Sequence, residues 1–249
     1  MKDLVEMPLR KRRRRLKFVG EDIVDDIRAK YGFEGDLSHF YARGTERLID
    51  KWHHYIPLYD RYFSHFRGTR VRFLEIGVSQ GGSLDLWRSY FGEKATIFGI
   101  DIDADCARFD GISGSVRIGS QSDPEFLDDV VSEMSGIDVV LDDGSHRMDH
   151  IRETLTHLFP KLARGGTYLI EDLQAAYFAE FGGGIDSDGN FFDELRRYAD
   201  ALHRHYHDAE VVPDFAREIS GVHMHDSIVV LDKGPVHPPC RSRVVRTGA

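Results

Sequence analysis

Cysteine is nearly absent from this chain, and so are long apolar runs. Only Cys106 and Cys240 occur among the 249 residues, and they do not form a CxxC pair. Two widely separated thiols argue against a disulfide scaffold and a cysteine metal site, so we expect free thiols in a reducing cytoplasm. No segment approaches the roughly 18 apolar residues of a membrane span, and no apolar stretch follows the N-terminal basic residues as in a secretory signal. The sequence predicts a cytoplasmic protein with no membrane partner.

A net positive charge is also lacking. The formal net charge of −9 argues against nucleic acid as a partner, because neutralising phosphates requires a basic surface. The one local exception is the basic run Arg10–Arg15, followed by Lys17. We interpret it as a solvated tail; the alternative is a contact with an anionic partner.

The regular feature of the chain is an alternation of apolar runs with helical patterns from residue 71 onward. Such alternation indicates βαβ units and a mostly parallel sheet. A hairpin within 218–231 is expected to close one sheet edge. The predicted fold class is α/β: a Rossmann-like, doubly wound, mostly parallel seven-stranded sheet with a C-terminal antiparallel hairpin and an N-terminal helical extension. The strands that precede the hairpin are expected at 71–76, 96–101, 115–118, 137–142 and 167–171.

The N-terminal quarter has a different pattern. We divide the chain into a basic tail (1–19), an N-terminal helical cap (20–66) and a main domain (67–249). Helices are predicted at 21–31 and 41–51 in the cap, and at 148–163 and 191–207 in the main domain, with Gly165 and Gly166 ending the third of these. The aromatic segment 51–60 fits either a helix packed on the sheet or a flap over a site.

Two of the apolar runs end in pairs of carboxylates. Asp142 and Asp143 end the run at 137–142, and Glu171 with Asp172 ends the run at 167–171. The carboxyl ends of parallel strands meet at the crevice where α/β proteins bind ligands. Unpaired carboxylates gathered there are costly, and a hard divalent cation such as Mg²⁺ or Ca²⁺ resolves that cost. The sequence therefore predicts a metal-dependent catalytic site, with His146 close to it.

The turn after the first strand predicts a small-molecule cofactor. Its glycines permit a tight turn and a close backbone approach, but the G-x-G-x-x-G pattern of dinucleotide enzymes is missing. Glu75 suits a ligand with an ammonium group, as in S-adenosylmethionine, and Asp101 is placed to accept hydrogen bonds from a ribose diol. The full set of cofactor-binding candidates is Glu75, Gly77, Ser79, Gly81, Ser83, Asp101, Gln121 and Asp142.

These motifs resemble those of the class I S-adenosylmethionine-dependent methyltransferases. The stretch 52–231 is similar to a narrower group, the metal-dependent sugar O-methyltransferases of antibiotic biosynthesis. The resemblance rests on Leu74–Gly77, Leu141–His146 and Ile170–Asp172. It implies that 67–249 is a methyltransferase domain that methylates a sugar hydroxyl of a glycosylated small-molecule acceptor, using S-adenosylmethionine and Mg²⁺. It also implies a homo-oligomer.

The resemblance further implies the roles of the site residues. The metal ligands would be Asp143, Glu171 and Asp172, and His146 would be the catalytic base beside Asp143. A base is chemically reasonable, because a sugar hydroxyl does not ionise at neutral pH while imidazole has a pKa near 6.5. For the acceptor, we expect contacts from Tyr55, Tyr59, Tyr177 and Phe178.

Several alternatives stay open from the residues themselves. Asp142 or Asp143 could cap a helix, His146 could be an ordinary turn histidine, and His150 is the rival base. The acceptor could be a catechol-like diol or a cephalosporin-type hydroxyl, and the protein could be a nucleotide-binding oxidoreductase, a hydroxylase or a silent binding module. A second metal site is less well supported, since no HExxH motif accompanies the other histidines, His203, His205, His207, His223 and His225.

Overall fold

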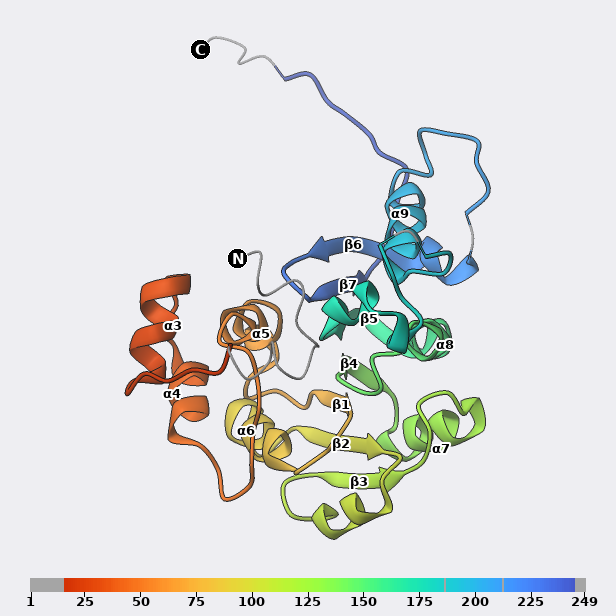
Figure 1. Ribbon diagram of the computed structural model, residues 1–249. Helices are drawn as coiled ribbons and strands as arrows, with labels where there is room; N and C mark the ends of the chain where they lie inside the picture. Colours follow the sequence, from red (N-terminus) through yellow and green to blue (C-terminus); the bar gives the residue numbers. More distant parts are fainter. Residues whose placement is uncertain (1–15, 186, 212, 245–249) are drawn as a thin grey trace.

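A seven-stranded mixed sheet runs through the centre of the molecule (Figure 1). The computed structural model describes residues 16–185, 187–211 and 213–244. The strands lie in the order β3-β2-β1-β4-β5-β7-β6. Their bounds are β1 Arg72–Ile76, β2 Thr96–Asp101, β3 Ser115–Ile118, β4 Ile137–Asp142, β5 Leu162–Ile170, β6 Ile219–Met224 and β7 Val229–Lys233.

The five strands β1 to β5 are parallel, and the C-terminal hairpin β6–β7 pairs antiparallel with β5. The order 3-2-1-4-5 of the parallel strands places β1 and β4 side by side, with Ile76 opposite Asp142. In a doubly wound sheet, ligands bind at this point, where the direction of winding reverses. The predicted Rossmann-like fold with a C-terminal hairpin is confirmed.

Helices cover both faces of the sheet (Figure 1). Helices α5 (Tyr55–Phe63) and α6 (Gly82–Phe91) cover one face, while α7 (Pro124–Met134), α8 (Met148–Leu158) and α9 (Phe191–Leu202) cover the other. Helices α3 (Ile23–Tyr31) and α4 (Asp36–Arg43) lie outside α5 and α6. Short 3₁₀ helices connect these elements at Ser64–Phe66, Ala104–Phe109, Phe159–Lys161, Leu173–Tyr177, Ala179–Phe181 and Asp214–Glu218.

The core has two halves because successive side chains of a strand point to opposite faces. Phe73 packs with the aromatic side chains of α5 and α6, such as Phe63 and Trp87. Its neighbour Leu74 belongs to the other half, with residues of α7 and α8 such as Leu155. Burial on both faces explains why these strands read as continuous apolar runs. Helix α5 of the predicted cap shares this core with strands of the predicted main domain. The boundary proposed at 66/67 stays a prediction.

One of the predicted helices was placed incorrectly, and two others end earlier than predicted. The helix expected at 41–51 lies instead at Asp36–Arg43. It ends at its C-cap residue Gly44, which has a positive φ of 70°. The helix expected to reach residue 163 ends at Leu158, because Pro160 follows and a 3₁₀ turn leads into β5. Gly165 and Gly166 therefore lie inside β5 and do not stop a helix. The helix predicted to reach residue 207 ends at Leu202.

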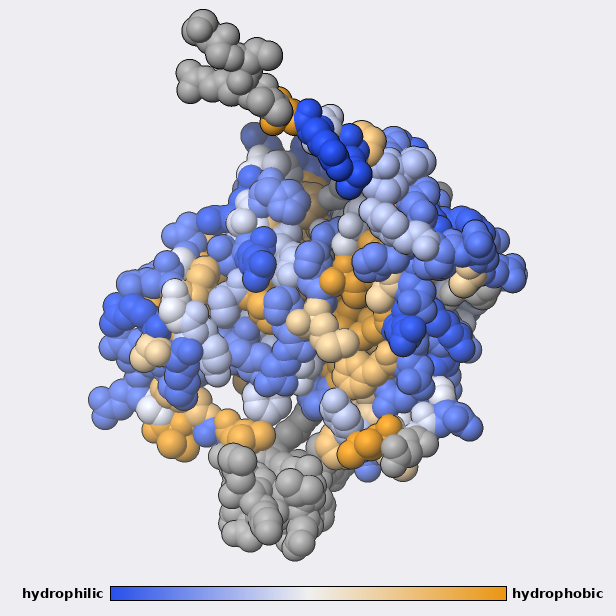
Figure 2. All heavy atoms as spheres, turned by 90° about the horizontal axis from the view of Figure 1, so that it is seen from above, coloured by the Kyte–Doolittle hydropathy of each residue, from blue (hydrophilic) through white to orange (hydrophobic). Residues whose placement is uncertain are grey.

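The surface is mainly hydrophilic, with smaller apolar areas (Figure 2). Cys106 and Cys240 are both free, as predicted. Of the helices described, none has the length and apolar character needed to cross a bilayer. The basic run Arg10–Arg15 lies outside the described residues, so its interpretation stays a prediction.

Candidate active site

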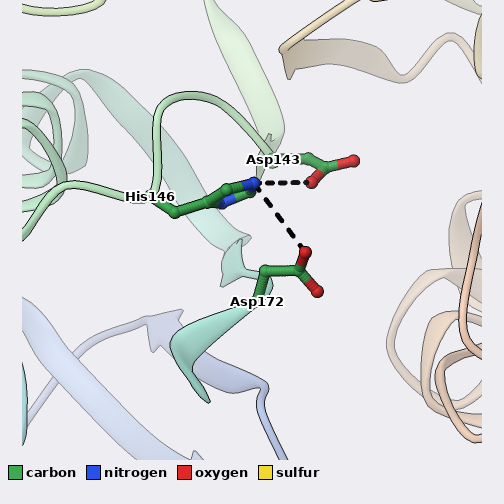
Figure 3. A group of neighbouring side chains, drawn as sticks. All are labelled: Asp143, His146 and Asp172. Atoms are coloured by element: carbon green, nitrogen blue, oxygen red, sulfur yellow. Dashed lines mark ion pairs between the residues drawn. The ribbon is translucent and has the colours of Figure 1, made fainter. Parts of the chain in front are cut away.

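The ends of β4 and β5 bring two carboxylates and an imidazole together (Figure 3). The Nε2 atom of His146 lies 3.8 Å from Asp143 Oδ1 and 3.8 Å from Asp172 Oδ2. One ligand atom from each of the three residues lies within 4.8 Å of the others. Within the described part of the chain, no other group of His, Cys, Asp and Glu side chains meets this condition. The predicted convergence of Asp143, His146 and Asp172 is therefore present.

Backbone conformation contributes to this convergence. His146 has a φ of 57° and Asp172 a φ of 53°, values that are uncommon for residues other than glycine. Such backbone strain is found most often at functional sites, where the surrounding structure maintains it. Here it turns the chain sharply at the end of β5 and in the loop after β4.

The four carboxylates do not all face the same way. Because side chains alternate along a strand, Asp142 lies on the α8 side of the sheet, while Asp143 and Glu171 lie on the α5 side. Asp142 is buried and accepts hydrogen bonds from Gln121 Nε2 at 3.2 Å and from the Tyr168 hydroxyl at 3.3 Å. Burial raises its pKa to about 7. It does not cap α8, whose N-cap residue is Arg147.

Helix α5 and Trp52, three residues before it, supply hydrogen-bond donors to the second acidic pair. The Tyr59 hydroxyl donates to Glu171 Oε1 at 2.5 Å. Asp172 Oδ1 accepts from the Tyr55 hydroxyl at 2.9 Å and from Trp52 Nε1 at 3.1 Å. Both tyrosines are fully buried, so in this structure they orient carboxylates and present no surface to an acceptor. Pro57 is compatible with this helix because it lies in the first turn.

Lys51 is the site residue that sequence reasoning missed. Its ammonium group lies 2.9 Å from Glu171 Oε2 and also contacts Asp143 Oδ2. Burial alone lowers the pKa of Lys51, but Asp143, Glu171 and Glu75 together raise it well above its usual value. Lys51 therefore stays protonated. The aromatic segment 51–60 was noticed, yet nothing in the sequence distinguishes this lysine from a surface residue.

The turn after β1 lies directly against the loop after β4. Gly77 has a φ of 95°, and a Cβ atom there would lie 2.1 Å from the carbonyl oxygen of Asp143. Glycine is therefore required both by the backbone conformation and by the close approach. This contact joins the predicted cofactor half to the predicted metal half.

Glu75 is buried at the end of β1 beneath this turn. It accepts hydrogen bonds from the Ser83 hydroxyl at 2.7 Å and from Trp87 Nε1 at 3.0 Å, both on α6. Burial raises its pKa to about 7, although Lys51 and the two hydrogen bonds act in the opposite direction. Glu75 is fully buried, so its predicted pairing with the ammonium group of a cofactor stays a prediction.

Asp101 lies at the end of β2, beside the same turn. Its Oδ2 atom accepts hydrogen bonds of 2.9 Å from the backbone N–H groups of Val78 and Ser79. Ser79 is exposed and has a positive φ of 49°. Asp101 therefore shapes the glycine turn, and its role towards a ribose stays a prediction.

A cavity of about 270 Å³ connects these parts. The turn after β1 contributes Gly77–Gln80 and Ser83 to its wall, and the catalytic candidates contribute Asp143, His146 and Asp172. Residues Leu48–Lys51 form the remaining side, so the segment before α5 covers the site in part. Of the aromatic segment 51–60, α5 is packed on the sheet and only Lys51 lines the cavity, so the structure favours the packed helix.

The remaining predicted residues lie around the cavity without lining it. Gly81, with a φ of 76°, begins α6, and Gln121 donates to Asp142 while accepting from the Ser145 backbone N–H at 2.8 Å. Tyr177 is 53% exposed and packs on Phe192 of α9, and Phe178 follows it at the end of the same 3₁₀ turn. Their acceptor role stays a prediction.

The rival base and the other histidines have partners of their own. His150 Nδ1 lies 2.9 Å from Ser145 Oγ, and His150 does not line the cavity. His203 and His207 bond to backbone carbonyls of α9, and His223 bonds to Asp232. They form no second metal cluster within the described residues.

Comparison with known proteins identifies the class of the domain. Residues 74–173 match a family model described as a methyltransferase domain. This range runs from β1 to the residue after Asp172, and so contains the glycine turn and both acidic pairs. Residues 74–173 are therefore a methyltransferase domain with a Rossmann-like fold.

Two of the chain's relatives are methyltransferases that act on sugar hydroxyls by name. Mycinamicin VI 2''-O-methyltransferase of Micromonospora griseorubida is 35% identical over 80% of this chain and 53% of its own length. A rhamnosyl-tetracenomycin-C 3'-O-methyltransferase of Streptomyces olivaceus is 35% identical over 84% of this chain and 56% of its own. The structure of MycE in complex with Mg, SAH and mycinamycin VI superposes with a TM-score of 0.70, at 30% identity, covering 87% of this chain and 54% of that one.

These relatives are sugar O-methyltransferases of macrolide and tetracenomycin biosynthesis by name. The resemblance inferred from the three motifs is confirmed. The chain spans about half the length of the curated relatives that it matches.

Proposed function

We propose that this protein transfers a methyl group from S-adenosylmethionine to a sugar hydroxyl of a glycosylated natural product, with the help of Mg²⁺. The observation that carries the proposal is the single cavity lined both by the turn after β1 and by Asp143, His146 and Asp172. A methyl donor and a metal-bound acceptor must meet in one space, and this cavity borders both predicted binding regions. The homologous enzymes act on rhamnosylated or macrolide substrates by name, and the MycE complex contains Mg and SAH.

The residues present fit a hard divalent cation. Asp143 and Asp172 offer carboxylate oxygens, the ligands that Mg²⁺ prefers, and Glu171 lies next to them. Tyr55, Tyr59 and Trp52 orient these carboxylates by hydrogen bonds, as the residues around a metal site commonly do. We therefore assign Asp143, Glu171 and Asp172 as the candidate ligands.

The residues also fit the methyl donor. Glu75 lies beneath the glycine turn and accepts a hydrogen bond from Ser83, which lines the cavity where the amino group of the donor would bind. When bound, S-adenosylmethionine supplies an electrophilic methyl group, and Mg²⁺ lowers the pKa of the acceptor hydroxyl. The protein's task is then to orient the acceptor and to remove its proton.

His146 is the proposed base. Its Nε2 atom faces Asp143 and Asp172 across the cavity wall (Figure 3). With acceptor and methyl donor bound, Nε2 would take the hydroxyl proton as the hydroxyl oxygen receives the methyl group and S-adenosylhomocysteine is left. Asp143 and Asp172 stabilise the imidazolium that results.

The test combines binding with turnover. S-adenosylmethionine is titrated calorimetrically into protein treated with a chelator, with NADH as the control ligand. Rhamnosylated and deoxysugar acceptors are then incubated with the protein, with and without Mg²⁺, beside a catechol acceptor. We expect S-adenosylmethionine alone to bind and a sugar acceptor to be methylated only with Mg²⁺. Binding of NADH, or metal-independent methylation, would contradict the proposal. Sedimentation of the same samples tests the expected homo-oligomer.

A further inference from the structure

Lys51 joins two carboxylates of the proposed metal site. Its Nζ atom lies 3.1 Å and 2.9 Å from the two oxygens of Glu171 and also contacts Asp143 Oδ2. The side chains of Lys51 and Glu171 are only 4% and 1% exposed. Burying such charges carries a large desolvation penalty, so stability alone is a weak explanation for this ion pair.

The local charge balance indicates what the lysine does. Asp143, Glu171 and Asp172 are three acidic groups close together at the edge of the cavity, with the Glu171 side chain buried and those of the other two partly exposed, and like charges this close repel one another. Lys51 lies between Asp143 and Glu171 and offsets part of this negative charge. The ammonium group thus occupies a position at which a cation is required even when no metal is bound.

The position of Lys51 is determined by the segment that covers the cavity. The Tyr41 hydroxyl donates to the Lys51 carbonyl oxygen at 2.7 Å. Four residues earlier, Arg47 Nε donates to Asp85 Oδ2 of α6 at 3.0 Å. Because the segment is held at both ends, the ammonium group is directed into the site and away from solvent.

We propose that Lys51 is an internal cation that keeps the carboxylates of this site together without metal and weakens metal binding. It acts as a positioning residue through Asp143 and Glu171. The consequence is a site that stays assembled when empty and holds Mg²⁺ reversibly. This inference rests on the proposed metal site of the methyltransferase.

The test is Lys51→Met in the full chain, with MgCl₂ alone as the probe at pH 8. Thermal unfolding is followed with increasing Mg²⁺, and the affinity is measured by calorimetry. We expect the variant to unfold at a lower temperature than the wild type without metal. We also expect it to bind Mg²⁺ about tenfold more tightly or better, since a nearby positive charge has been removed, and to gain more thermal stability from Mg²⁺ than the wild type does.

Two further variants separate this role from a purely structural one. Lys233 is equally buried, with 7% of its side chain exposed, but it bonds to the Phe159 and Pro160 carbonyls near the start of β5. Lys233→Met should lower the unfolding temperature and leave the Mg²⁺ affinity unchanged. Lys51→Arg keeps the charge and should bind Mg²⁺ within about threefold of the wild type.

The outcomes distinguish this inference from the proposed function. If the wild type and Lys51→Met both fail to bind Mg²⁺, the proposed metal site itself is wrong. If the wild type binds but Lys51→Met binds equally or more weakly, only the role of Lys51 is overturned. If Lys51→Met does not fold without metal, folding restored by Mg²⁺ supports the inference, and a variant unfolded at every Mg²⁺ concentration contradicts it.

Discussion

The Tyr55 hydroxyl donates a hydrogen bond of 2.9 Å to Asp172 Oδ1, although 117 positions separate the two residues. The same hydroxyl also accepts a 3.3 Å hydrogen bond from the Asp172 backbone N–H. A single side chain of α5 thus holds both the position and the orientation of a proposed metal ligand. Helix α5, which precedes the predicted main domain, therefore contributes to the candidate site.

The first prediction concerns this contact. Tyr55→Phe removes the donor without removing the buried ring, so the fold should persist while Asp172 loses orientation. We expect Mg²⁺ affinity to fall about tenfold, the lower end of the usual effect of residues that orient metal ligands. S-adenosylmethionine affinity should change by less than about twofold. Calorimetric titration with each ligand measures both effects.

Tyr62→Phe is the matched control for this variant. Tyr62 lies on the same helix, but its hydroxyl bonds to His225 Nε2 at 2.8 Å, away from the proposed ligands. It should bind Mg²⁺ as the wild type does. If both variants bind Mg²⁺ with wild-type affinity, Tyr55 has no role in orienting a ligand.

The second prediction tests the base. His146→Ala should lower kcat by about 10²-fold or more, the range expected for a positioned general base, while Mg²⁺ affinity stays within about threefold. His150→Ala, at the rival histidine, should retain most activity because His150 does not line the cavity. Loss of Mg²⁺ binding in His146→Ala would show that this imidazole is a metal ligand and not the base.

The third prediction concerns the contact between the two halves of the site. In Gly77→Ala the new Cβ would meet the Asp143 carbonyl oxygen at 2.1 Å. The control Gly32→Ala lies at the left-handed C-cap of α3, with φ 65° and ψ 24°, and has nothing within 4 Å of the new atom. Both variants bear the backbone penalty of roughly 1 kcal/mol, and only Gly77→Ala has the clash. We expect it to lose about 2 kcal/mol more in urea unfolding; equal losses would mean that the turn relaxes freely.

The fourth prediction follows from the pKa of Glu75, which burial raises from 4.5 to about 7. Between these pH values the folded protein binds more protons than the unfolded chain, so the free energy of unfolding decreases as pH rises. Glu75→Gln removes this contribution. We compare the free energy of unfolding of the ligand-free variant with that of the wild type at each pH. This difference should shift in favour of the variant by up to about 3 kcal/mol between pH 5 and pH 8. Urea unfolding at the two pH values measures the difference.

Glu133→Gln provides a control of opposite sign. Its hydrogen bond to Arg117 lowers the pKa of the exposed Glu133 carboxyl, so this variant should lose stability above pH 4.5 and not below it. Identical pH profiles for the wild type and Glu75→Gln would contradict the raised pKa of Glu75.

The elements that sequence predicted well are those with local signals. The strand ends at Asp142 and Ile170 were recognisable because an apolar run stops at an acidic pair, and glycines mark the turn after Ile76. The ends of helices were predicted less well. Hydrophobic periodicity continues beyond Arg43 and Leu158, although Gly44 and Pro160 break the helical backbone there.

The sequence by itself thus determined the alternation of strands and helices, the glycine turn and the acidic residues at the strand ends, since each depends on neighbours along the chain. Only the tertiary structure decided which of these acidic residues share a face of the sheet and which side chains they contact. The alternation of side chains across the sheet separates Asp142 from Asp143, and packing of α5 places Tyr59 beside Glu171. Lys51 enters the site from 120 positions away. Contacts over such distances depend on how the helices pack on the sheet, which no local pattern encodes.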